Sequence, residues 1–195
     1  MSTNPSSQNQ EPKIPISGRL GRIAKFIEEE SGRDILMAVM ADYKKYESTS
    51  SQAKKADWVR HMIARLEKMV GEKTSLKIME ACGRKCCGLT TRKNAEKFMR
   101  ESDSLEQFVA TLNEHGIGGG RLRITQKGDI TGGYDHCYCG LVKHTTEPFP
   151  TKTYCQCSVG WYKQLFETGL DRPVDVQIIQ SLITCANSCE FMIHI

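Results

Sequence analysis

The C-terminal stretch VDVQIIQSLITCANSCEFMIHI, residues 174–195, decides the fold. Its apolar side chains occupy alternate positions on either side of a turn at residues 186–188: Val174, Val176, Ile178, Phe191, Ile193 and Ile195. Successive side chains of a strand point to opposite faces, so this alternation is typical of two strands with one buried face. The stretch therefore predicts an antiparallel hairpin at the end of the chain.

Upstream of the hairpin, residues 18–116 show helical periodicity instead. The clearest stripe has apolar residues three and four positions apart: Val59, Met62, Ile63, Leu66, Met69 and Val70. This spacing places the side chains on one face of an amphipathic helix, and Gly71 is a suitable C-terminal stop. Further helices are predicted around Leu76 and between the N-cap Asp103 and Gly116.

The period changes to two after the glycines at residues 118–120. The pattern that follows predicts, in order, these elements: a strand near 121–125, a turn at 127–129, a strand over 130–142, a helix over 157–169 and the terminal hairpin. Helices followed by antiparallel strands indicate an α+β fold, with N-terminal helices packed on a C-terminal antiparallel sheet.

One domain is expected from 195 residues of which 39% are hydrophobic. Residues 1–17 are rich in Ser, Asn, Gln and Pro, and we expect them to be a disordered tail. Residues 18–195 then form a single domain, with a helical half at 18–116 and a sheet-containing half at 117–195.

Charge and hydropathy exclude two classes of partner. The net charge of +4 and the aromatic content of 7% do not make a nucleic-acid interface, which needs clustered Lys and Arg beside stacking aromatics. No apolar run approaches the roughly 20 residues of a membrane helix, and residues 1–16 lack the order of a signal peptide. We therefore expect a cytoplasmic protein with no membrane or nucleic-acid partner; the sequence is compatible with a homodimer.

The nine cysteines are clustered rather than scattered. Six of them form close pairs: Cys82 with Cys86 on one face of a helix, Cys137 with Cys139 on one face of a strand, and Cys155 with Cys157 at a helix start, where a thiolate is favoured. An odd number of cysteines in a reducing compartment argues against a disulfide framework. The six are our candidate metal ligands, and their chemistry suits zinc or an iron–sulfur cluster, with copper(I) as a further option.

Each cysteine group also has a plainer interpretation. Cys82 and Cys86 could continue the apolar stripe of their helix, since a free cysteine packs as a small hydrophobe. Cys185 and Cys189 are expected to pack at the hairpin end, facing each other across the turn. The role of Cys87 stays open, and His136 is a weaker candidate ligand beside the Cys137 pair.

Residues 154–195 carry a family resemblance. A cysteine-led helix beginning Cys157-Ser158-Val159-Gly160-Trp161-Tyr162, a strand and a tight turn precede Cys189-Glu190-Phe191-Met192-Ile193. This pattern resembles the 4-vinyl reductase domain family and is similar to bacterial aminothiazoline-carboxylate hydrolase-like proteins. Cys185 and Ala186 depart from it, because a glycine often occupies this turn.

The resemblance implies helices packed on an antiparallel sheet, a fold shared with haem-based nitric-oxide sensors and trafficking-complex subunits. It also implies a pocket between helices and sheet for a small hydrophobic ligand or cofactor, and cysteine ligation of a metal. Trp161, Tyr162 and Phe166 are our candidates for contacting such a ligand, with ordinary core packing as the alternative. The family name does not transfer the reductase chemistry, because a shared fold does not carry it.

We accordingly expect a cytoplasmic module that binds a small molecule and a cysteine-ligated metal in a sensory or accessory role. A metal-dependent or thiol-dependent hydrolase of a small substrate is the enzymatic alternative, and it would need an open coordination position or an activated thiol. The third hypothesis is an iron–sulfur redox protein.

Overall fold

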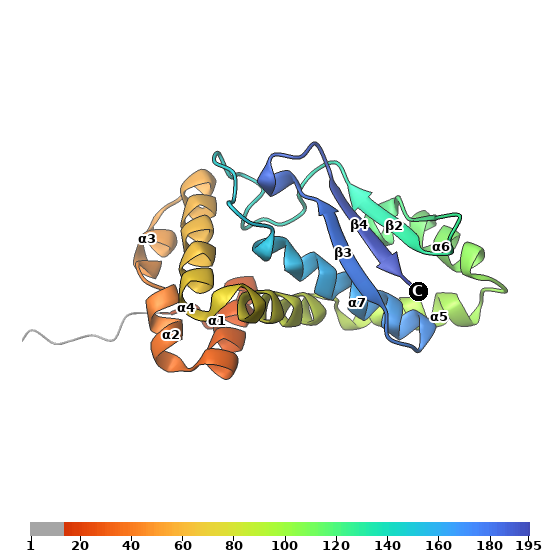
Figure 1. The fold of residues 1–195 in the computed structure, drawn as a ribbon, viewed down its shortest axis with the longest axis horizontal. Coiled ribbons are helices and arrows are strands. Elements are labelled where there is room, and N and C mark those ends of the chain that lie inside the picture. Colours follow the sequence, from red (N-terminus) through yellow and green to blue (C-terminus); the bar gives the residue numbers. More distant parts are fainter. Residues whose placement is uncertain (1–13) are drawn as a thin grey trace, which may run out of the picture.

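Helices occupy the first half of the computed structural model, which describes residues 14–195, and a four-stranded sheet lies in the second half (Figure 1). The helices are α1 (Gly18–Ser31), α2 (Arg33–Val39), α3 (Tyr43–Ser48), α4 (Gln52–Cys86), α5 (Leu89–Arg100), α6 (Leu105–Glu114) and α7 (Gln156–Leu170). The strands are β1 (Arg123–Ile124), β2 (Ile130–Tyr134), β3 (Asp175–Gln180) and β4 (Cys189–His194). The protein has the predicted α+β architecture.

Helix α4 bends sharply at Gly71, where the sequence predicts a helix stop. This glycine has φ 78° and ψ 166°, a left-handed φ that a residue with a side chain rarely adopts. The apolar stripe before the bend is buried, whereas Met69, next to the bend, is 42% exposed. No helix within residues 14–195 is long and apolar enough to cross a membrane.

The sheet is antiparallel, with the strand order β1-β2-β4-β3. In the terminal hairpin Val176 pairs with Ile193 and Ile178 with Phe191, which confirms the predicted antiparallel hairpin. Short 3₁₀-helices join several of the elements: η1 (Ile117–Gly120), η2 (Thr153–Cys155) and η3 (Leu182–Thr184).

Helix α7 links the two halves of the molecule. On one side it packs along α4 and α5, and on the other it lies against β3 and β4 (Figure 1). Its apolar side chains meet the inner face of the sheet, where Phe191 and Ile193 are fully buried. The C-terminal half of α4 and the first turns of α7 therefore lie side by side at the centre of the molecule.

The strand predicted over residues 130–142 is too long. Strand β2 ends at Tyr134, and the chain then leaves the sheet as a loop that packs against the N-terminal helices. Leu141 and Val142 join the core cluster of α1, α2 and α4, so burial draws this segment away from the sheet. The pair Cys137 and Cys139 consequently lies in that loop, not in a strand.

Two further expectations need correction. The first strand of the hairpin ends at Gln180, and Cys185 lies inside the turn with φ 68°. Cys185 is exposed while Cys189 is buried, so the two do not face each other. Of the predicted tail, residues 1–13 lie outside the described residues, but Pro15 is buried and Ile14 packs against the core.

Candidate functional site

Two glycines set the separation of α4 and α7. A Cβ on Gly83 would overlap the carbonyl oxygen of Cys157, and a Cβ on Gly160 would overlap that of Glu80. The two backbones are in direct contact, and for this reason neither position tolerates a side chain. This contact brings the last turn of α4, which carries Cys82 and Cys86, beside the start of α7.

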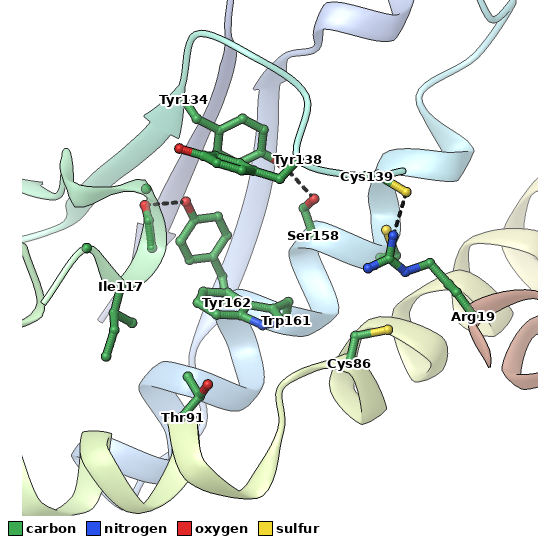
Figure 2. Close-up of a pocket in the computed structure, with 14 residues that line it drawn as sticks. Arg19, Cys86, Thr91, Ile117, Tyr134, Tyr138, Cys139, Ser158, Trp161 and Tyr162 are labelled. Atoms are coloured by element: carbon green, nitrogen blue, oxygen red, sulfur yellow. Dashed lines mark hydrogen bonds between the residues drawn. The ribbon is translucent and has the colours of Figure 1, made fainter. Parts of the chain in front are cut away.

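Four cysteines gather at this contact, the last three of them around Arg19, and we call them the pocket cysteines: Cys82, Cys86, Cys139 and Cys157. Arg19 of α1 donates a hydrogen bond from Nη1 to Cys139 Sγ at 2.7 Å (Figure 2). The Tyr154 hydroxyl lies 2.9 Å from the same sulfur. Arg22, one turn further along α1, donates from Nη2 to Cys86 Sγ at 3.4 Å.

The Cys82 thiol and the two arginines favour the thiolate at Cys86. The hydrogen bond from Cys82 lowers the pKa of Cys86 most, and Arg22 and Arg19 lower it further, against the opposing effect of burial. The same hydrogen bond, with burial, raises the pKa of Cys82. Of this pair, Cys86 is therefore the thiol that ionises more readily.

Burial keeps two neighbouring thiols protonated. It raises the pKa of Cys157 to about 12, and the nearby Cys139 adds to this effect. It also raises the pKa of Cys137 to about 11. Burial alone would lower the pKa of Arg19, but Cys139, Tyr154, Cys86 and Cys157 together raise it, so the guanidinium stays charged among the sulfurs.

A cavity of about 440 Å³ joins this cysteine end to an aromatic end. Arg19, Cys86, Cys139 and Cys157 line the first end, and the second is lined by Tyr134, Tyr138, Trp161, Tyr162 and the glycine-rich residues 116–119 (Figure 2). Tyr162 donates a hydrogen bond from its hydroxyl to the Gly118 carbonyl at 2.9 Å. The Tyr134 hydroxyl lies 3.0 Å from Ser158 Oγ, so both tyrosines are fixed in the wall.

The structure separates the predicted site residues into groups. Cys82, Cys86, Cys139 and Cys157 come together, and Cys137 lies next to Cys139 in the loop after β2. Trp161 and Tyr162 line the cavity. Phe166 packs in the core instead, stacked on Tyr162 with ring centroids 6.4 Å apart. His136 is exposed and packs against Tyr138.

Cys155 belongs to a different pair, with Cys189, which we call the buried pair. Cys155 Sγ lies 2.9 Å from Ser181 Oγ, and Cys189 Sγ lies 3.9 Å from the same oxygen. The Leu182 backbone N–H donates to Cys189 Sγ at 3.4 Å. The hydrogen bond from Cys155 lowers the pKa of Cys189 most, although burial opposes it.

Several lining residues were not found from the sequence. Arg19 and Arg22 stand beside the apolar stripe of α1, but no local pattern connects them with cysteines that follow 60 to 140 positions later. Tyr134 ends β2, Ser158 lies in the first turn of α7, and Tyr138 lies in the loop after β2. The sequence offers a signal for Tyr138, which alternates with Cys137 and Cys139.

Within residues 14–195, no group of three or more His, Cys, Asp or Glu side chains is arranged to hold a metal ion. A search of the curated proteins gives no match to the chain. A protein-family model does match, over residues 20–195, and its description is a family of unknown function, DUF6144. With almost the whole chain covered, the protein belongs to the DUF6144 family.

Proposed function

We propose that the protein is a binding module for a small planar organic acid. The observation that carries this proposal is the single cavity that joins aromatic walls to an arginine–cysteine end. Its volume of about 440 Å³ falls in the range of small-molecule sites, which combine apolar walls with a few polar groups.

The balance of charge at the cysteine end favours an anionic ligand. Arg19 and Arg22 bring two positive charges, against the single thiolate of Cys86. Among the described residues neither arginine has an ion pair with a carboxylate, and the buried Nε of Arg22 has no hydrogen-bond partner. A carboxylate beside Arg19 would supply the missing charge, and hydrogen bonds between ions are among the stronger ones.

The aromatic end selects a flat apolar group. Trp161 packs edge to face against Tyr162, with centroids 5.4 Å apart, and Tyr134 meets Tyr138 in the same way at 5.2 Å. Tyr138 is 61% exposed, so a ligand that covers its ring would remove apolar surface from water.

Isothermal titration calorimetry with trans-cinnamate, a planar aromatic acid, tests the proposal. We expect binding of cinnamate, weaker binding of neutral cinnamamide, and an affinity loss of about tenfold in Arg19→Gln, as for one charged hydrogen bond. Arg33→Gln is the matched control, since Arg33 is exposed on α2 and paired with Glu28. Equal binding of the acid and the amide, or no binding of either, would contradict the proposal.

A thiophilic metal ion is the second candidate ligand, and it is favoured by the chemistry of the donors. Thiols from three separate segments surround one cation, Arg19, and thiols suit zinc and iron–sulfur clusters. As placed, however, these side chains do not fit a metal, because the guanidinium lies among the sulfurs.

Zinc would compete with Arg19 for the same sulfurs. If the metal hypothesis holds, Arg19→Gln binds zinc more tightly than the wild type in a competition titration, while Cys139→Ser binds it less tightly. A visible spectrum of protein purified without oxygen distinguishes an iron–sulfur cluster from zinc. Unchanged zinc affinity in both variants would remove this candidate.

We also propose a cytoplasmic location and a sensory or accessory role. All nine cysteines are free, and free thiols persist in a reducing compartment. The resemblance to 4-vinyl reductase domains stays a prediction, and a homodimer stays compatible with the sequence, since the family match describes no activity or assembly.

A further inference from the structure

We propose that Cys86 is a nucleophilic thiol that adds covalently to a conjugated aromatic carbonyl compound held in the cavity, with Arg19 binding the oxygen anion that the addition creates. This inference rests on the proposed ligand pocket. It does not depend on a metal.

The position of Cys86 distinguishes it from the other pocket cysteines. Its side chain lies in the last turn of α4 and lines the cavity together with Arg19 (Figure 2). Cys82 is fully buried, and the sulfur of Cys139 already contacts both Arg19 and Tyr154. Reactive cysteines are partly exposed and lie in positive surroundings, which describes Cys86 beside Arg22.

The proton balance at the site prepares the thiol. Cys82 keeps the shared proton and donates a hydrogen bond to Cys86, whose pKa is lowered by that bond and by Arg22. Cys157 cannot compete as a nucleophile near neutral pH, because burial raises its pKa to about 12. Among the thiols that line the cavity, Cys86 is therefore the one that accepts a hydrogen bond from Arg22.

The reaction conserves atoms and charge. The Cys86 sulfur forms a bond to the β-carbon, the carbon–carbon π bond breaks, and its electron pair moves to the carbonyl oxygen as an enolate. The Arg19 guanidinium donates hydrogen bonds to that oxygen and keeps its own protons. The α-carbon then takes one proton from water, which leaves a saturated carbonyl compound joined to Cys86 through a thioether.

The cavity walls should make the reaction selective for electrophiles that carry an aromatic ring. A ring joined to the enal can lie between Trp161 and Tyr138, whereas a methyl group in its place leaves these walls uncovered. We therefore compare trans-cinnamaldehyde with crotonaldehyde, which carry the same reactive group.

The pH dependence of the reaction is set by the groups that face Cys86. These are Cys82 and Cys87 on α4, Arg19 and Arg22 on α1, Cys157 on α7 and Cys139 in the loop after β2. Arg22 and Arg19 bring positive charge to this sulfur, so we expect Cys86 to react in weakly acidic solution, where an ordinary thiol is protonated.

The experiment treats chelator-washed protein with each aldehyde at about pH 6, where an ordinary thiol near pKa 8.5 is almost fully protonated. Intact mass and peptide mapping then locate and time the adduct. We expect one adduct, on Cys86. Each rate is divided by the rate of the same aldehyde with N-acetylcysteine, and the resulting ratio should be at least about tenfold higher for cinnamaldehyde than for crotonaldehyde. Cys86→Ser should abolish it, and Cys185→Ser, which removes the exposed turn thiol, should not change it.

Two arginine variants separate the roles at the site. Arg22→Gln should slow both cinnamaldehyde and iodoacetamide, because it acts on the thiolate itself. Arg19→Gln should lower the rate of Cys86 modification by cinnamaldehyde about tenfold more than the rate with iodoacetamide, because the iodoacetamide reaction makes no enolate. Circular dichroism melting confirms that each variant is folded.

Labelling of Cys185 before Cys86, or an unchanged rate in Cys86→Ser, would overturn the inference. If cinnamate binds and the adduct still spreads over all thiols, the pocket proposal survives and only Cys86 chemistry fails. If a Cys86 adduct forms with both aldehydes equally and cinnamate does not bind, the pocket proposal fails, and the aromatic specificity inferred here fails with it.

Discussion

The pocket cysteines and the buried pair show how one residue type acquires two roles. Three of the pocket cysteines, Cys86, Cys139 and Cys157, line a cavity together with Arg19, and Arg22 donates a hydrogen bond to Cys86. Cys155 and Cys189 meet beside Ser181, where a serine hydroxyl and a backbone N–H are their hydrogen-bond partners. A charged neighbour and access to a ligand make a thiol chemically useful, whereas neutral partners and burial make it a packing group.

The largest effect is expected where the backbones of α4 and α7 touch. Gly83→Ala places a methyl group on the Cys157 carbonyl, and the helices must part, at a cost of about 3 kcal/mol or more. Urea unfolding measures the loss. Gly88→Ala is the matched control, since its Cβ meets nothing within 4 Å. If Gly83→Ala disturbs the pocket cysteines and leaves the buried pair unchanged, the glycine contact positions only the pocket cysteines.

The next effect concerns the hydroxyl that the buried pair shares. Ser181→Ala leaves Cys155 without its closest polar partner, and we expect a loss of about 1–2 kcal/mol in the free energy of unfolding. Cys185→Ala, at the exposed turn, should cost almost nothing. If both variants were equally stable, the hydrogen bonds of the buried pair would contribute no stability.

The pH dependence of stability tests the lowered pKa of Cys86. The folded pKa of Cys86 lies below its unfolded value near 9.0, so the thiolate stabilises the fold above that value and this contribution is lost as the pH falls toward the folded pKa. As the pH rises from about 6 to about 9, the free energy of unfolding of the wild type should therefore increase relative to that of Cys86→Ser, by on the order of 1 kcal/mol after solvent screening. Thermal melts across this range measure the gap, and a gap that narrows toward pH 9 would contradict the assignment.

The smallest effect is expected from Arg22, whose single hydrogen bond to Cys86 is long at 3.4 Å. Arg22→Gln should change stability by only a few tenths of a kcal/mol, because this partly buried side chain makes one long hydrogen bond. It should nevertheless slow alkylation of Cys86 by iodoacetamide severalfold near neutral pH, because the thiol regains a proton. Labelling of the buried pair after unfolding in urea is the internal reference and should not change.

Much of the fold was predictable because its signals are local. The α4 stripe from Val59 to Leu66 and the alternation of Val176 with Ile178 each report on one element and its buried face. The bend at Gly71 was equally visible, since glycine is suited to the left-handed φ found there. The strand predicted to continue beyond Tyr134 was wrong for the opposite reason. Val142 packs in the helical core, and no local pattern indicates that contact.

The sequence predicted that cysteines form the site, but it predicted only some of the cysteines that come together there. The spacing of Cys82 and Cys86 on one helix face placed two sulfurs together, and the structure adds Cys139 and Cys157 to them. Cys155 was grouped with Cys157 by proximity in sequence, yet its side chain points to Ser181 on the sheet side. Two residues apart at the start of a helix means two different faces, so the pair divides between two environments.

The amino-acid sequence by itself determined the α+β class, the amphipathic faces and the thiol content, because periodicity and residue chemistry act within one element. Only the tertiary structure decided which thiols meet a charged partner. Arg19 and Arg22 reach Cys139 and Cys86 from a helix far away in the chain, and the contact of Gly83 with Cys157 joins α4 to α7. The pKa of a thiol depends on charges within a few ångströms, and that neighbourhood exists only after the helices have packed.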